Sequence, residues 1–324
     1  HLPALLRPET RNRIQIVCAV EASEERAEAL RAAVPDVRIY RTITEMAARE
    51  SVDFVDICLP PNLHAGAVRE AIDAKINIIC EKPLARSLEE SEELVSAIKN
   101  SGLHFKPCHQ YAYSPVWTKF QEYLDVASDG AKVFLMFNIF RLHADNGFDP
   151  KNPGWRVDPS VSGGGILADT GYHYFYLLLR MLGAPKSVNC SVFNLHHTEY
   201  KGEDSAFVDF AMPRGTARMN LSWAGSQRHN SAVIVSPNGT VNYNGQAISF
   251  VRDGITETAP MPDMSDKANY IALYERLFLD FADTMDSGAT DYSELDEAAS
   301  AMRMLGLCYR SDAERRRIDF EAGA

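Results

Sequence analysis

Short apolar runs alternate with stretches of helical periodicity throughout the first hundred residues, and this alternation limits the fold more than any other feature. The apolar runs cover residues 14–20, 54–59 and 76–80, and the helical stretches cover 24–33, 65–74 and 88–100. A strand that is followed each time by a helix predicts βαβ units. We therefore expect an α/β domain whose parallel sheet is covered by helices on both faces.

The pattern changes after about residue 112. Strand-like segments then dominate, and turn sequences such as Pro213-Arg214-Gly215 join several of them. The predicted strands are 132–141, 187–195, 206–212, 216–223, 232–236 and 247–252, and the predicted helices are 167–182, 270–286 and 294–313. This pattern predicts a C-terminal α+β domain with a large, open, mostly antiparallel sheet. We expect residues 1–112 and 113–324 to form the two domains.

The composition excludes several classes of protein. The formal net charge of −11 argues against nucleic-acid binding, because contacts with phosphates need clustered Lys and Arg. No apolar run is long enough to span a membrane, and no signal peptide is recognisable. The six cysteines lack the spacing of metal ligands or of a redox motif. We expect a cytoplasmic protein with reduced thiols and no metal site, which binds neither nucleic acid nor a membrane.

Glu21 stands directly after the first predicted strand. In dinucleotide-binding (Rossmann) domains an acid at this place accepts hydrogen bonds from the adenosine ribose, about 20 residues beyond a glycine-rich phosphate loop. Counting back from Glu21 places that loop before His1, so the first strand and the loop are expected to precede the chain as given. The alternative interpretation is that Glu21 caps the helix that follows it.

Glu81-Lys82-Pro83 follows the buried run that ends at Cys80. In open α/β sheets ligands bind outside the carboxyl ends of the strands, so Lys82 stands where a cofactor and a substrate would meet. A lysine there is suited to general acid or base catalysis, because burial and a nearby cation lower its pKa. The Lys82-Pro83 bond is a candidate for the cis form. The alternative is a surface turn with solvated side chains.

Three glycines, 163–165, precede a predicted helix that is apolar on nearly every side. Asp169 and His173 are spaced i, i+4 on this helix and therefore share one face. A buried carboxylate and a buried imidazole need polar partners. A catalytic pair that faces a substrate hydroxyl would satisfy them, and so would a structural hydrogen bond between the two side chains.

These motifs, in this order, resemble the Gfo/Idh/MocA family, which includes glucose–fructose oxidoreductase and inositol dehydrogenase. The resemblance rests on Glu81-Lys82-Pro83, on the block from Trp155-Arg156 to His173, on the loop 59–64 and on the final helical segment 305–311. It implies hydride transfer between a nicotinamide and a secondary alcohol or ketone of a sugar, amino sugar or cyclitol. Two positions depart from the family pattern: Tyr176 replaces a common acid, and Ala112 replaces a common Arg.

The same resemblance implies the site residues. Lys82, Asp169 and His173 would be catalytic, and with Trp155 and Arg156 they would also contact the substrate. NAD is expected over NADP, because a carboxylate at Glu21 repels a 2′-phosphate. The residues implied to bind the cofactor are Glu21, Arg26, Pro60, Asn62, His64, Glu81, Lys82 and Gln110.

Two other functions stay open: an NAD-dependent glycoside hydrolase that oxidises its sugar transiently, and a non-catalytic regulator that senses NAD or a sugar. The assembly is also predicted. The C-terminal sheet has predicted helices for one face only, and Leu221 and Trp223 place apolar side chains on its strands. An open apolar face is normally covered by another subunit, so we expect a homodimer or homotetramer that packs through this sheet.

Overall fold

The computed structural model describes residues 1–145, 154–264 and 266–320. Its first part contains only parallel strand pairs, as predicted. Strand β1 (Cys18–Val20) pairs with β2 (Arg38–Tyr40), and β3 (Phe54–Ile57), β4 (Asn77–Cys80) and β5 (Phe105–Pro107) form a separate three-stranded sheet. Because β3, β4 and β5 are parallel, their carboxyl ends meet at one edge of their sheet.

Four helices connect these strands: α3 (Glu24–Ala33), α4 (Ile43–Ala47), α5 (Pro61–Asp73) and α6 (Leu88–Ser101). Local capping explains where three of them begin. The side chains of Ser23, Thr42 and Ser87 each accept a hydrogen bond from a backbone N–H in the first turn of α3, α4 and α6. Helix α6 ends at Gly102, which has a positive φ. Helix α4 and strand β2 were not predicted, because both are very short.

The second part is built on a nine-stranded sheet with the order β13-β12-β11-β10-β6-β9-β8-β7-β14. Only the pair β6–β9 is parallel, so the predicted mostly antiparallel sheet is confirmed. Its strands are β6 (Val133–Phe140), β7 (Ser187–Phe193), β8 (Ser205–Met212), β9 (Gly215–Ser222), β10 (His229–Ser236), β11 (Gly239–Tyr243), β12 (Ala247–Arg252), β13 (Ile255–Pro260) and β14 (Ile318–Asp319).

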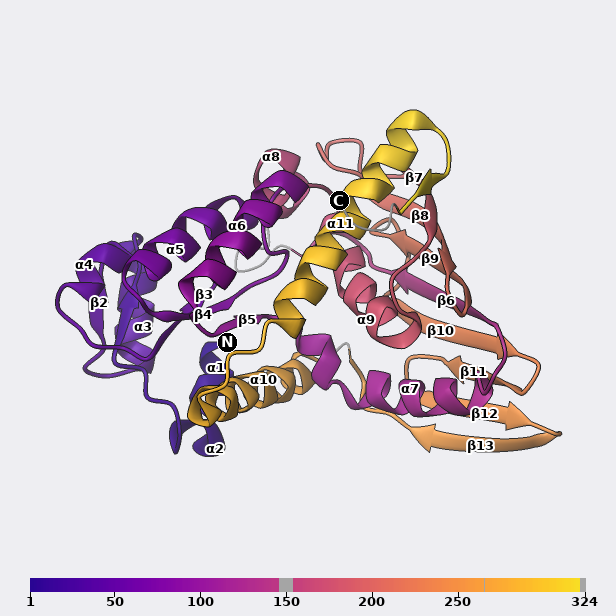
Figure 1. Cartoon of the computed structure of the whole chain (residues 1–324), viewed down its shortest axis with the longest axis horizontal. Coiled ribbons are helices and arrows are strands. Elements are labelled where there is room, and N and C mark those ends of the chain that lie inside the picture. The colour runs from indigo at the N-terminus through magenta and orange to yellow at the C-terminus, as the bar shows by residue number, and fades with distance from the viewer. Residues whose placement is uncertain (146–153, 265, 321–324) are drawn as a thin grey trace.

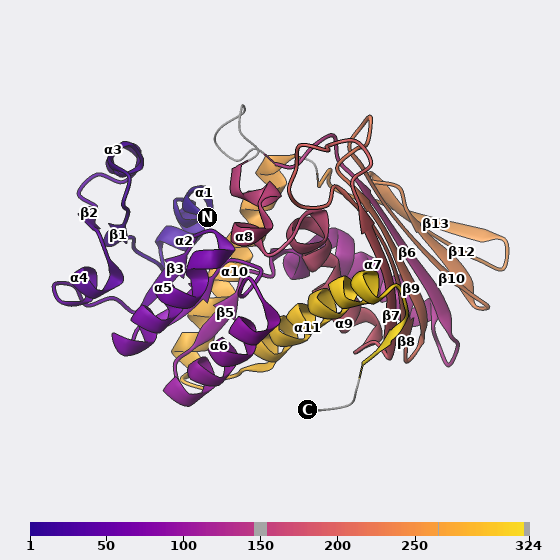
Figure 2. The ribbon, with the colours of Figure 1, turned by 90° about the horizontal axis from the view of Figure 1, so that it is seen from above.

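Helices cover one face of this sheet. Helices α7 (Pro115–Ala127), α9 (Tyr172–Leu182) and α11 (Ser293–Glu314) lie on the face that points toward the parallel strands, and Figure 2 shows no helix on the opposite face within the described residues. One expectation about this opposite face was wrong. Leu221 is 0% exposed and its side chain approaches Gly171 of the helical segment 167–171, so it lies on the helix-covered side. Trp223, just beyond β9, is 1% exposed. The large apolar side chains that remain exposed on the strands include Phe134, Phe207 and Val235.

Helix α10 (Lys267–Ser287) connects the two parts, as Figure 1 shows. It packs against α1 (Leu2–Leu5) and α2 (Pro8–Arg11), and its Phe278 and Phe281 share an apolar cluster with Leu5 and with Ile79 of β4. Helix α11 in turn contacts both α6 and β7. Within the described residues no helix is long and apolar enough to cross a membrane.

Candidate active site

Lys82 stands two residues after the end of β4 and lies largely buried, with its side chain 10% exposed. Its Nζ donates a hydrogen bond to the backbone carbonyl of Asp169 (2.5 Å) and lies 3.7 Å from the Asp169 carboxylate. The Lys82-Pro83 peptide bond is cis, as the sequence suggested. The interpretation as a solvated surface turn is therefore wrong, because Lys82 points to a residue that is distant in sequence.

Asp169 lies between two cations. Besides Lys82, the Arg156 guanidinium approaches its carboxylate (Nε to Oδ1, 3.5 Å). Arg156 also lies over the ring of Trp155, 4.4 Å from its centroid, as expected for a cation–π contact. The two residues predicted to contact substrate thus lie next to the predicted catalytic acid. Trp155 and Arg156 belong to a short 3-10 helix, Gly154–Val157.

The helix that carries Asp169 begins with a wide turn. A single helix over 167–182 was predicted, but the structure has a π-helical segment over Leu167–Gly171, followed by α9. π-Helical turns inside helices are frequent at functional sites. This turn changes the angle between Asp169 and His173 from the one that an α-helix would give.

Glu203 fixes the glycine segment in front of this turn, and sequence reasoning missed it. Its buried carboxylate accepts hydrogen bonds from the backbone N–H of Gly165 (2.9 Å) and of Leu167 (3.0 Å) and from the Tyr309 hydroxyl (2.9 Å). Burial raises the pKa of this carboxyl group. A β-carbon at Gly164 would lie 1.8 Å from the Tyr309 hydroxyl oxygen, which explains the lack of a side chain there.

His173 is buried, with 8% of its surface exposed. Its ring stacks on Tyr111, with centroids 4.3 Å apart, and its Nδ1 lies 3.1 Å from the Tyr176 hydroxyl oxygen. Burial, together with the charge of Lys82, holds the pKa of His173 well below its ordinary value, so the ring is neutral at neutral pH. Between the described residues Asp169 and His173 no hydrogen bond is formed, so the structural Asp–His pair was a wrong alternative.

Glu21 and Arg26, both predicted to bind the cofactor, contact each other. The Arg26 Nε and Nη2 atoms donate to the Glu21 carboxylate, each at 3.0 Å, and the Ser23 backbone N–H donates to it at 2.7 Å. These contacts explain the lowered pKa of Glu21, since they outweigh the raising effect of burial. The N-cap of α3 is Ser23, so Glu21 is not the cap itself.

The other predicted cofactor residues lie around the ends of β3, β4 and β5. Pro60 precedes α5, and Asn62 lies in its first turn. His64 is fully buried, with Nδ1 2.9 Å from the Pro83 carbonyl and Nε2 2.8 Å from the Leu59 carbonyl. It therefore holds the segment after β3 against the segment after β4.

Glu81 and Gln110 belong to one hydrogen-bonded chain. The Gln110 Nε2 donates to the Tyr274 hydroxyl (3.0 Å), which donates to Glu81 (2.9 Å). The other Glu81 oxygen accepts the backbone N–H of Lys82. Burial alone would raise the pKa of Glu81, but the neighbouring His1 and Lys82 hold it well below its ordinary value. Tyr274 lies on α10, nearly two hundred residues further along the chain, and no sequence signal indicated it.

One group of ligand-type side chains was not foreseen. His1, Asp56 and Cys108 place an imidazole nitrogen, a carboxylate oxygen and a thiol sulfur within 4.8 Å of one another, although their sequence spacing indicates no metal site. Both ring nitrogens of His1 lie 2.8 Å from a carboxylate oxygen, one of Asp56 and one of Glu81. These hydrogen bonds account for the position of the His1 ring between the two carboxylates.

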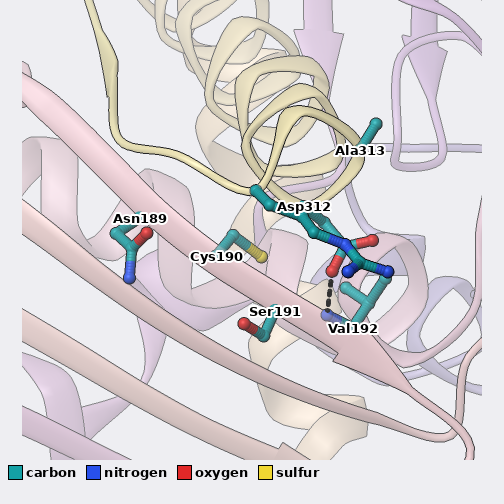
Figure 3. Close-up of a pocket in the computed structure, with 7 residues that line it drawn as sticks. Asn189, Cys190, Ser191, Val192, Asp312 and Ala313 are labelled. Carbon is teal, nitrogen blue, oxygen red and sulfur yellow. Dashed lines mark hydrogen bonds between the residues drawn. The ribbon is translucent and has the colours of Figure 1, made fainter.

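A cavity of about 550 Å³ lies away from these residues, between β7 and the end of α11 (Figure 3). It is lined by Asn189, Cys190, Ser191, Val192, Asp312, Ala313 and Arg315. Asp312 accepts the backbone N–H of Val192 at 2.9 Å and so ties the helix to the strand. None of the predicted site residues lines this cavity, so it is not part of the candidate active site.

Two family profiles match the chain, one in each part. Residues 1–109 match an oxidoreductase family with an NAD-binding Rossmann fold. Residues 137–242 match the GFO/IDH/MocA C-terminal domain. The first match contains Lys82, and the second contains Asp169 and His173.

Two curated relatives match over nearly the whole chain. D-xylose 1-dehydrogenase (NADP(+)) 2 of Haloferax volcanii is 26% identical over 322 residues, covering 91% of this chain and 92% of that protein. The scyllo-inositol 2-dehydrogenase (NADP(+)) IolU of Bacillus subtilis is 22% identical over 312 residues, covering 92% of both. The crystal structure of an oxidoreductase from Thermotoga maritima is similar with a TM-score of 0.84 and 20% identity, covering 98% of this chain and 93% of that one. This last likeness shows the fold.

Proposed function

We propose that this chain, which belongs to the Gfo/Idh/MocA family of oxidoreductases, transfers a hydride between a nicotinamide cofactor and a secondary alcohol or ketone of a sugar, amino sugar or cyclitol. The observation that carries this proposal is the meeting of Lys82, Asp169, Arg156 and His173 beyond the carboxyl end of β4. The substrate class is supported by the names of the two relatives, one a xylose and one an inositol dehydrogenase.

The residues after the parallel strands fit a dinucleotide. Glu21 follows β1 and Lys82 follows β4, and ligands of open α/β sheets bind at this end of the strands. Gln110, just beyond β5, has a buried Oε1 without a partner among the described residues, so an acceptor remains for a ligand. When bound, the nicotinamide would supply the carbon that gives or takes the hydride. The residues that we propose to hold the cofactor are Glu21, Arg26, Pro60, Asn62, His64, Glu81, Lys82 and Gln110.

NAD is the proposed cofactor, although both relatives are named for NADP. The Glu21 carboxylate is only partly buried, and hydrogen bonds from Ser23 and Arg26 keep it ionised. A carboxylate still has acceptor sites for two ribose hydroxyls but repels a 2′-phosphate. Arg26 works against this preference, because its guanidinium is able to bind a phosphate.

The catalytic roles follow from charge and position. We assign Lys82 to exchange the proton of the reacting hydroxyl. Its ammonium has three N–H donors, and the two Asp169 oxygens near it, one of the backbone carbonyl and one of the carboxylate, leave one donor for the substrate. Asp169 orients Lys82 and Arg156, since its carboxylate lies between them. His173 contacts the substrate oxygen as a neutral ring. Trp155 and Arg156 bind the rest of the polyol.

The test is a turnover screen of the full-length protein with polyols, cyclitols and amino sugars, read by nicotinamide absorbance with both cofactors. We expect Lys82→Met to lower turnover by about 10²–10⁴-fold while NADH binding, measured by fluorescence, persists. Lys119→Met, on the surface of α7, is the matched control and should change neither. Glycoside cleavage without net reduction of the cofactor would favour a hydrolase. Binding without any turnover would favour a regulator.

We also propose the assembly and the compartment. Residues 113–324 would bind substrate and pair with another subunit through the uncovered face of the large sheet, whereas 1–112 would bind the cofactor. Phe134, Phe207 and Val235 expose apolar surface on strands of this sheet. Phe207→Asp should therefore shift a homodimer or homotetramer toward monomers in light scattering, and a wild-type monomer at micromolar concentration would contradict the interface. The six free thiols support a cytoplasmic location.

A further inference from the structure

Tyr176 makes an unusual contact with the proposed catalytic imidazole. Its side chain is fully buried on α9, one turn after His173. Two groups lie within hydrogen-bonding distance of its hydroxyl oxygen: the backbone N–H of Tyr111 and the Nδ1 of His173, both at 3.1 Å. The Tyr176 hydroxyl therefore sits between a group that is only a donor and a ring nitrogen whose role depends on the tautomer.

The direction of these two hydrogen bonds follows from the count of donors. Burial raises the pKa of Tyr176 well above its ordinary value, so the phenol keeps its proton. The Tyr111 backbone N–H donates to the phenol oxygen and cannot accept. Among the described residues His173 Nδ1 is the remaining partner for the buried O–H, and a buried donor without an acceptor costs about 1–3 kcal/mol. The Tyr176 O–H thus points to Nδ1.

We propose that Tyr176 holds His173 as the neutral tautomer with its proton on Nε2. The ring then presents an N–H donor, not a base, to the substrate oxygen. Nε2 is the ring nitrogen that has no partner among the described residues, so this donor is free for a ligand. Tyr176 is a positioning residue, and this inference rests on the function proposed above.

The tautomer divides the work between His173 and Lys82. In ketone reduction the carbonyl carbon receives the hydride and the π electrons of the C=O bond move to the oxygen. His173 Nε2–H stabilises the charge that develops there. The oxygen takes its proton from the Lys82 ammonium, which becomes an amine and recovers a proton from solvent. In alcohol oxidation the same steps run in reverse and the hydroxyl proton passes to the Lys82 side chain, because His173 has no free lone pair facing the substrate.

The decisive measurement is the ¹⁵N NMR spectrum of the full-length protein labelled in histidine, with His173 assigned from the signals lost in His173→Gln. We expect an unprotonated Nδ1 and a protonated Nε2 near neutral pH. The pKa of this ring also depends on the charges of neighbouring groups, which are Lys82, Glu81, His109 and Arg141. A proton on Nδ1 in the wild type would overturn the proposal.

Variants then test the role of the hydroxyl. Tyr176→Phe should give shifts averaged between the two tautomers, and Tyr176→Glu, which replaces the donor by an acceptor, should move the proton to Nδ1. Tyr172→Phe is the matched control, because its buried hydroxyl donates to the Ala298 carbonyl instead. Wild-type shifts equal to those of Tyr176→Phe would show that the hydroxyl does not select the tautomer.

These spectra are recorded without substrate, so they are independent of the proposed activity. Tautomer shifts as expected, combined with no hydride transfer to any substrate, would leave the assignment of Tyr176 intact and overturn the proposed function. If the protein is an active dehydrogenase, Tyr176→Glu should lower turnover in ketone reduction by about 100-fold, the usual effect of losing one donor to the reacting oxygen. Full activity in Tyr176→Glu would overturn the division of work between His173 and Lys82.

Discussion

Gly165→Ala is the substitution whose consequence is most closely set by the structure. A β-carbon at Gly165 would lie 2.0 Å from the carbonyl oxygen of Glu203, and 2.6 and 2.8 Å from its backbone nitrogen and carbonyl carbon. Since ordinary contacts begin near 3.4 Å, the two backbone segments must separate by about 1.4 Å. This movement also strains the hydrogen bonds from Gly165 and Ile166 to Glu203.

Backbone atoms cannot turn aside as a flexible side chain can, so we place the cost at the upper end of the range for overpacking. An overpacking penalty of about 3 kcal/mol, plus about 1 kcal/mol for each weakened hydrogen bond, gives a loss of about 3–5 kcal/mol. At roughly 1.5 °C per kcal/mol for a chain of 324 residues, the melting temperature should fall by about 4–7 °C. Turnover should fall as well, because the displaced segment leads into the π-helical turn that carries Asp169.

Calorimetry of the purified variants measures this loss, with Gly66→Ala as the matched control. Gly66 lies within α5, and nothing is found within 4 Å of its added β-carbon. Alanine is favoured over glycine in a helix by up to about 1 kcal/mol, so the control should be neutral or more stable than the wild type. A melting temperature for Gly165→Ala that equals that of Gly66→Ala would refute the close approach of Gly165 to Glu203.

Three further predictions concern Glu203, Glu21 and His173. Glu203→Ala leaves three buried donors without an acceptor and should lower the free energy of unfolding in urea by about 3–6 kcal/mol. Glu203→Gln retains part of the contacts, so equal losses of unfolding free energy in the two variants would argue against the assigned hydrogen bonds. Glu21→Gln should raise NADPH affinity relative to NADH by about tenfold in fluorescence titrations, and an unchanged ratio would remove Glu21 from cofactor selection. Because the pKa of His173 is lowered in the folded state, its contribution to stability is present above its ordinary pKa of 6.5 and is lost as the pH falls below that value. The melting temperature of His173→Gln should therefore fall less than that of the wild type between about pH 7.5 and 5.5, and identical pH profiles would contradict the depressed pKa.

The fold was predictable where the spacing of apolar residues along the chain indicates which side chains are buried. The alternation of strands and helices in the first hundred residues was enough to predict parallel strands. The spacing of apolar residues in each segment distinguishes a buried strand from a helix with one buried face, and strands that alternate with helices form parallel sheets. The large sheet was predicted for the same reason. Leu221 and Trp223 were assigned to the open face, which is wrong, since alternation along β9 and just beyond it does not say which side the helices cover. That choice depends on how α7, α9 and α11 pack.

For the candidate site, the sequence indicated several of the residues but not their contacts, and it did not indicate Glu203 or Tyr274. Lys82 was recognised because it follows a buried strand, and parallel strands place such residues at one edge of the sheet. The spacing of Asp169 and His173 suggested a pair, but the π-helical turn joins Asp169 to Lys82 and Arg156 instead. These contacts could not be predicted from the local periodicity, because the wide turn depends on partners outside the helix.

The sequence by itself determined the alternation of strands and helices in the first part, the mostly antiparallel strands of the second part and the residues that stand at the ends of strands, because these follow from the chemistry of neighbours along the chain. It did not indicate α4, β2 or α7. Only the tertiary structure decided that the Tyr176 hydroxyl forms a hydrogen bond with His173 and that the Glu203 carboxylate accepts hydrogen bonds from the glycine segment. It also decided that Tyr274 of α10 reaches Glu81. Glu203 and Tyr274 are each separated from their hydrogen-bond partners by tens to hundreds of residues. Such contacts cannot be recognised in local sequence patterns, because the partner of a buried polar group is set only when distant segments pack around it.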